Sequence, residues 1–105
     1  MYNEYREIYN ADIQNKTIKV KGLVTDADTG NGLKGVQIQF KLNNKLVLDK
    51  VTADGGGFLI NTLDDGEYTV IFIKLGYKKQ MKTVQVSNTD QLKVIVSLIR
   101  LNSNW

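Results

Sequence analysis

Residues 36–42 read VQIQFKL, with an apolar side chain at every second position and a polar one between each pair. Because successive side chains of a β-strand point to opposite faces, this alternation predicts a strand with one buried and one solvated face. Residues 18–24 repeat the pattern, with Lys19 and Lys21 on the polar face. No stretch after residue 16 shows a convincing helical period. The chain is therefore expected to be all-β.

Five further strands are expected, because short runs rich in Val, Ile, Phe, Tyr and Thr lie between clusters of Gly, Asn and Asp. These runs cover residues 46–52, 58–60, 67–75, 78–86 and 91–101. Short strands at this spacing predict a seven-stranded antiparallel β-sandwich over residues 17–101. Residues 1–16 are expected to form an N-terminal extension or linker, and residues 102–105 a C-terminal tail.

The composition excludes several kinds of chemistry. The chain has 105 residues, enough for one core, and contains neither His nor Cys. These absences rule out Ser-His-Asp triads, His-based zinc sites, thiolate metal sites and disulfides. The net charge of +3 is spread along the chain, so no nucleic-acid partner is indicated. No apolar run is long enough for a membrane-spanning segment, and residues 1–15 lack the apolar core of a signal peptide.

Two of the expected strands break the simple alternation. Residues 68–73 and 94–99 are apolar on both faces, whereas an antiparallel sandwich normally has polar outer faces. Their outward side chains therefore predict a contact surface on the fifth and seventh strands. The residues at its centre are Ile71, Ile73, Ile95 and Ile99.

Two candidates for the segment or molecule that covers this surface are left open by the sequence. Apolar side chains recur near helical spacing in the N-terminal extension, so a short amphipathic helix over residues 3–14 could lie across it. A partner protein or a second copy of the chain is the other candidate. Some cover is expected, because burying a large apolar side chain stabilises by about 1.5–3 kcal/mol.

A series of short motifs runs through the expected strands and turns. It consists of Gly22-Leu23-Val24-Thr25-Asp26 with Thr29-Gly30, Thr52-Ala53-Asp54 with Gly57-Phe58, Gly66-Glu67-Tyr68-Thr69-Val70, and Gly76-Tyr77. In this order the motifs resemble the carboxypeptidase regulatory-like domain, a family in the same sandwich group as transthyretin and Cna B-type domains. The resemblance covers about residues 17–101. It implies a seven-stranded Greek-key sandwich of the transthyretin (prealbumin) type.

The same resemblance implies an accessory domain without an active site. Such domains are usually parts of larger exported or surface proteins, which implies an extracytoplasmic location. We therefore expect a non-catalytic structural or protein-interaction module of a bacterial cell-envelope or secreted protein, with no cofactor. The expected partner is another protein, another domain of a parent protein, or a second copy. The alternative is a carbohydrate- or calcium-binding accessory domain that uses its loops.

The alternatives rest on few residues. For calcium, the weak candidates are Asp26, Asp28 and Asp54, but Gly30 stands where an EF-hand loop has its third ligand. For carbohydrate, the aromatic residues outside the expected strands are Tyr2, Tyr5, Tyr9 and Trp105.

Two kinds of chemistry known in this sandwich group do not suit the sequence. An internal amide, as in Cna B-type domains, could use Lys19 or Lys21 with Glu67 as the assisting acid, but residues 92–101 contain no Asn or Asp. The transthyretin-like hydroxyisourate hydrolases rely on histidines, which this chain lacks.

Overall fold

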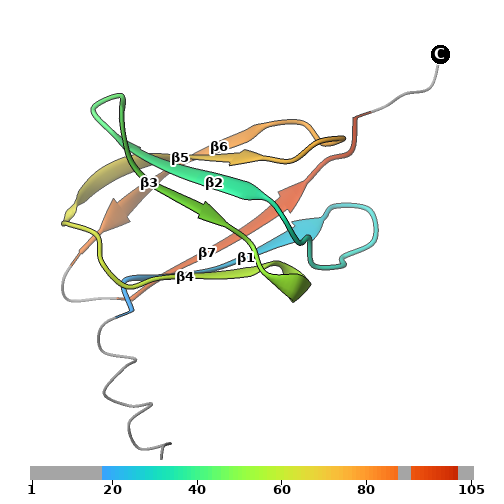
Figure 1. Ribbon diagram of the computed structural model, residues 1–105, viewed down its shortest axis with the longest axis horizontal. Coiled ribbons are helices and arrows are strands. Elements are labelled where there is room, and N and C mark those ends of the chain that lie inside the picture. The colour runs from blue at the N-terminus through green and yellow to red at the C-terminus, as the bar shows by residue number, and fades with distance from the viewer. Residues whose placement is uncertain (1–17, 88–90, 102–105) are drawn as a thin grey trace, which may run out of the picture.

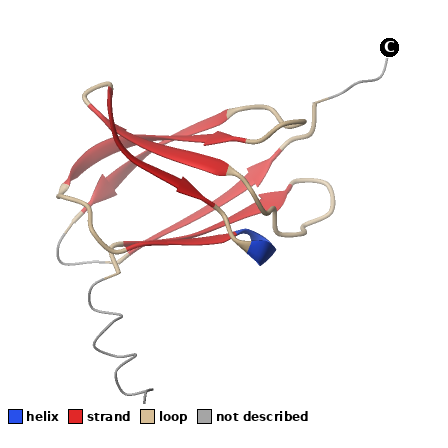
Figure 2. Cartoon of the chain, in the orientation of Figure 1, coloured by secondary structure: helices blue, strands red, loops and turns tan. Residues whose placement is uncertain are grey.

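Seven β-strands form two stacked sheets in the computed structural model, which describes residues 18–87 and 91–101 (Figure 1). The strands are β1 (Val20–Asp26), β2 (Gln37–Leu42), β3 (Lys45–Val51), β4 (Gly57–Ile60), β5 (Gly66–Ile73), β6 (Gln80–Val86) and β7 (Leu92–Leu98). A single turn of 3-10 helix, η1 (Asp54–Gly56), precedes β4 (Figure 2). The predicted seven-stranded sandwich is confirmed. Among the described residues, no helix is long and apolar enough to cross a bilayer.

The sheets contain three and four strands, in the orders β4-β1-β7 and β3-β2-β5-β6. The β2–β3 and β5–β6 connections are hairpins within one sheet, and every other connection crosses to the opposite sheet. All strand pairs are antiparallel except β1 and β7, which run parallel with Val20 opposite Leu92. The expectation of a fully antiparallel arrangement is therefore wrong for this pair. A parallel pair needs a long connection, and here the rest of the domain provides it.

Alternate side chains from the two sheets fill the space between them. The buried apolar residues are Val20, Val24, Val36, Ile38, Phe40, Phe58, Ile60, Leu63, Tyr68, Val70, Phe72, Val86, Val94, Val96 and Leu98. At the centre, the rings of Phe40 and Tyr68 meet edge to face, with centroids 6.1 Å apart. The Tyr68 hydroxyl donates a hydrogen bond to the backbone carbonyl of Asp64 at 2.7 Å, so this buried polar group is satisfied.

The predicted N-terminal helix over residues 3–14 and the C-terminal tail at 102–105 lie outside the described residues. The cover that was expected from the N-terminal extension therefore stays a prediction.

Candidate functional site

Asp26 is buried at the end of β1, with 2% of its surface exposed. The hydroxyl of Tyr77, in the β5–β6 loop, donates to its Oδ2 at 2.6 Å, and Nε of Arg100 donates to the same oxygen at 2.8 Å. The backbone N–H groups of Asp28 and Thr29 donate to Oδ1 at 2.8 and 3.1 Å. Three remote chain segments thus meet at one carboxylate. We refer to Asp26, Tyr77 and Arg100 as the Asp26 cluster.

The contacts within the Asp26 cluster fix its charge state. Hydrogen bonds from Tyr77, then from Arg100, hold the pKa of Asp26 well below its ordinary value, although burial acts in the opposite direction. The hydrogen bond to Asp26 in turn raises the pKa of Tyr77 and that of Arg100. At neutral pH the cluster holds a carboxylate, a neutral phenol and a guanidinium. None of the three groups has the intermediate pKa that suits a general acid or base. The cluster therefore has a structural role, in which its hydrogen bonds hold three segments of the chain together.

The metal candidates Asp26, Asp28 and Asp54 do not form a common site. A carboxylate has about four acceptor positions, and the O–H and N–H donors named above occupy those of Asp26. The Asp54 side chain is 87% exposed and forms an ion pair with Lys34 at 3.3 Å. Within residues 18–87 and 91–101, no group of three or more potential ligand side chains is placed to hold a metal ion.

The residues considered for an internal amide are not arranged for that reaction. Lys19 pairs with Asp65 at 3.6 Å, Lys21 is exposed on β1, and Glu67 is exposed on β5. Formation of such a bond needs buried and adjacent reactants. The aromatic residues considered for glycan binding lie outside the described part of the chain, namely Tyr2, Tyr5, Tyr9 and Trp105.

The four isoleucines that were predicted to form one contact surface belong to two opposite faces. Ile71 and Ile73 lie on β5 of the four-stranded sheet, whereas Ile95 lies on β7 of the three-stranded sheet and Ile99 follows it. The two sheets stack face to face, so their outer faces point away from each other (Figure 1). A single surface over β5 and β7 is therefore wrong, because side-chain alternation does not reveal which sheet a strand joins.

The two pairs also differ in exposure. Ile71 is buried on its central strand, where it lies between Gln39 of β2 and Met81 of β6, and Ile73 is half-buried. Ile95 is 66% exposed and Ile99 is 47% exposed. Of the four predicted contact residues, therefore, only Ile95 and Ile99 are largely exposed to solvent.

Ile95 has apolar neighbours on the outer face of the three-stranded sheet. Leu23 of β1 lies opposite it, and Leu59 of β4 lies opposite Lys21 in the adjoining row. Leu23 and Leu59 are 37% and 46% exposed. We refer to Leu23, Leu59 and Ile95 as the outer patch. Neither Leu23 nor Leu59 was predicted from the sequence as a contact residue, because only the strand order brings these three side chains together.

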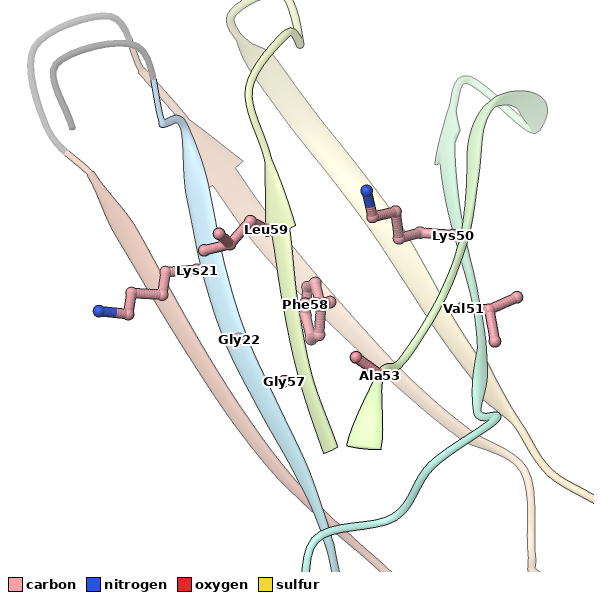
Figure 3. A pocket seen from close by; sticks show the side chains of 8 residues that line it. All are labelled: Lys21, Gly22, Lys50, Val51, Ala53, Gly57, Phe58 and Leu59. Atoms are coloured by element: carbon pink, nitrogen blue, oxygen red, sulfur yellow. The ribbon is translucent and has the colours of Figure 1, made fainter. Parts of the chain in front are cut away.

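A groove runs between β3 and β4, the edge strands of the two sheets. Its wider part has a volume of about 530 Å³ and is lined by Lys21, Gly22, Lys50, Val51, Ala53, Gly57, Phe58 and Leu59. A second hollow of about 180 Å³ shares Lys50 and Leu59 with it and reaches Asn61 and Thr62. Figure 3 shows Phe58, Ala53 and Lys50 directed toward the space between the strands, and Val51 directed away from it. Of its lining residues, Lys21 was considered from the sequence only as an amine for an internal amide, and the groove itself was not predicted.

Comparisons with known proteins agree with this architecture. The sequence profile of the CarboxypepD_reg-like domain matches residues 20–103. No curated protein sequence matches the chain. One similar solved structure is the TIE protein of Bacillus anthracis, with a TM-score of 0.66 and 19% identity over 81% of this chain and 17% of that one.

Two further structures share the fold. The 5-hydroxyisourate hydrolase of Klebsiella pneumoniae has a TM-score of 0.61 and 16% identity over 80% of this chain and 98% of that one. The group B streptococcus pilus 2b backbone protein has a TM-score of 0.63 and 17% identity over 79% of this chain and 41% of that one. At these identities the likeness shows the fold alone. The chain spans nearly the whole hydrolase but less than half of the pilus and TIE proteins.

Proposed function

Because the chain belongs to the CarboxypepD_reg-like domain family, we propose that it is a non-catalytic structural or protein-interaction module of a bacterial cell-envelope or secreted protein. Similar folds in a pilus backbone protein and in the major pilin subunit of Bacillus cereus support a structural role and an extracytoplasmic location. In both of those proteins the matched region is a minor part of a longer chain, 41% and 29% of it.

The ionisable side chains support a non-catalytic role. The buried carboxylate of Asp26 is fully hydrogen-bonded, and the shifted pKa values of the Asp26 cluster move away from neutrality. The hydrolase that shares the fold is an enzyme by its name. This chain has no His that could act as a general base near pH 7. The shared fold does not by itself assign that activity to this chain.

The outer patch is the observation that carries the interaction proposal. Ile95 projects from the outer face of the sheet and is 66% exposed. Leu23 lies directly opposite it, and Leu59 lies in the adjoining row of the same face. Removing apolar surface from water contributes about 25 cal/mol per Å², so a partner that covers these side chains gains affinity from all three. Of the four isoleucines predicted from the sequence, Ile95 and Ile99 are proposed as contact residues. Ile71 and Ile73 are not, because neighbouring side chains of their own sheet already cover them to a large extent.

The first test asks whether the partner is a second copy. Light scattering on a sizing column, over a series of concentrations, compares the wild-type chain with Ile95→Lys. A dimer that dissociates in the variant supports a homotypic contact through the outer patch.

If the chain is monomeric, a photocrosslinking amino acid at position 95 tests for a different partner in the bacterial envelope. Position 85, an exposed site on β6, is the matched control. Adducts specific to position 95 that disappear when Leu23→Lys is added support the proposal. Equal adducts at both positions, together with a monomeric wild type, would overturn it.

A further inference from the structure

The edge strand β3 is largely uncovered on the side that faces the other sheet. Each of the other six strands contains at least one buried residue, whereas no residue of β3 is buried and only Leu48 is half-buried. Leu48 and Lys50 pair with Phe40 and Ile38, which point into the core, so they lie on the same inner face. Leu48 packs partly against the core whereas Lys50 is exposed, so the opposite sheet does not extend beneath the whole of β3.

The strand count explains this exposure. Four strands face three, and β6 lies beside β7 at one side of the sandwich. At the other side β4 ends the smaller sheet, and within the described residues no strand lies beyond it beneath β3. The groove between β3 and β4 occupies this position. The groove thus lies where a fourth strand of the smaller sheet would run.

We propose that this groove binds an extended segment of a partner protein, which adds as a strand to the free edge of β4. An edge strand has backbone N–H and C=O groups that point away from its sheet, and pairing with them is an established mode of peptide recognition. The added strand completes a sandwich of four strands over four and covers the inner face of β3. The inference rests on the proposed role as a protein-interaction module and gives it a second contact site.

The lining of the groove defines the chemistry of the segment. Lys50 is the charged side chain that points into the space between the strands, whereas Lys21 lines the wider part from β1 and extends away from it (Figure 3); no acidic residue lines either part. Neither lysine forms an ion pair within the described ranges. Leu48, Ala53 and Phe58 provide apolar contacts, whereas the side chain of Leu59 points away from β3 toward the outer patch (Figure 3). The segment should therefore alternate apolar and polar side chains and carry Asp or Glu where it passes Lys50.

Charge favours a separate acidic segment over a second copy. The chain has a net charge of +3, and β4 itself contains no acidic residue that could face Lys50 of another molecule. Because β4 has only four residues, and the carbonyl of Gly57 already accepts a hydrogen bond from the N–H of Ala53 at 3.0 Å, backbone pairing alone offers few hydrogen bonds. The side-chain contacts in the groove must supply much of the affinity, which makes binding sensitive to the charge at position 50.

A displayed library of random linear peptides, selected against the full chain, tests the proposal. The enriched sequences should alternate apolar and polar residues and be acidic. In NMR spectra, the bound peptides should shift the backbone amide signals of residues 58–61 and of β3. They should also protect the amides of residues 58–61 from hydrogen exchange. Lys50→Glu should weaken binding by about tenfold, because it places like charges opposite each other. Lys82→Glu, the same charge change on the exposed edge of β6, should leave binding unchanged.

Other outcomes contradict the proposal. It is overturned if no peptide is enriched, or if the enriched peptides bind the Lys50→Glu chain equally well. Protection of the β4 amides by residues 1–17 before any peptide is added would overturn it too, as would pairing of β4 with a second copy. Peptides that instead shift the NMR signals of Leu23 and Ile95 would indicate binding at the outer patch and not in the groove. Ile95→Lys should leave groove binding intact, so the two contact sites can fail independently.

Discussion

Phe58 of β4 is paired with Gly22 of β1, and its ring occupies the space that a side chain at position 22 would fill. A Cβ built on Gly22 would lie 2.0 Å from Cζ of Phe58, far closer than two carbon atoms can approach. The glycine is thus required by close packing, since Phe58 is 4% exposed and fixed within the core.

Gly22→Ala is therefore expected to lower the free energy of unfolding by about 1–3 kcal/mol, as overpacking in a filled core does. Chemical denaturation measures the change. Gly57→Ala is the matched control on the paired strand, because a Cβ there meets nothing nearer than 3.9 Å. Adding Phe58→Leu to Gly22→Ala should recover part of the loss. A Gly22→Ala chain as stable as the wild type would contradict the packing.

Thr52 joins two segments through its buried hydroxyl. Its Oγ1 accepts a hydrogen bond from the backbone N–H of Val36 at 2.9 Å and donates one to the carbonyl of Leu33 at 2.6 Å. Thr52→Val keeps the shape but leaves the Val36 N–H without this partner, so we expect a loss of about 1–3 kcal/mol in unfolding free energy. The exposed Thr83→Val on β6 serves as control and should change stability little. Equal stability of the two variants would show that the Thr52 contacts contribute nothing.

The strands could be predicted from the sequence because alternation and turn residues are local signals. Residues 36–42 were predicted as a strand and form β2 at Gln37–Leu42, and the expected strand at 67–75 forms β5 at Gly66–Ile73. What alternation leaves open is the partner of each strand. The outward apolar positions of β5 and β7 were predicted to form one surface, and this assignment failed because the two strands belong to different sheets.

The Asp26 cluster shows a second limit of local signals. Asp26 was singled out as an oxygen ligand, yet its side-chain donors Tyr77 and Arg100 lie 51 and 74 residues away in the sequence. Only the pairing of the β5–β6 loop with the segment after β7, through the Tyr77–Arg100 bridge, brings them to Asp26. The groove beneath β3 is hidden from the sequence for the same reason, since it results from the number of strands in each sheet.

The β2–β3 hairpin depends on two asparagines with left-handed backbone conformations. Asn43 and Asn44 have φ angles of 51° and 68° in the two-residue loop between Leu42 and Lys45. Such loops favour glycine at the second position, so Asn44→Gly should preserve or slightly raise stability. Asn44→Val should cost about 1–2 kcal/mol, because a branched side chain is strained at positive φ. Thermal unfolding compares both with Asn61→Val, a control without positive φ; an Asn44→Val chain that matches this control would contradict the turn assignment.

Asp26 is expected to make the free energy of unfolding depend on acid pH. Its pKa in the folded chain lies below the ordinary value of 3.8, so its stabilisation is complete above that value and declines as the pH falls toward the folded-state pKa. Asp26→Asn removes the charge that Tyr77 and Arg100 contact, and should lower stability at neutral pH and flatten its decline between about pH 4 and pH 2. Urea unfolding at successive pH values measures both effects. Asp28→Asn, whose exposed side chain lies outside the cluster, should keep the wild-type pH profile; an Asp26→Asn chain that also keeps it would show that the buried carboxylate is not held by these contacts.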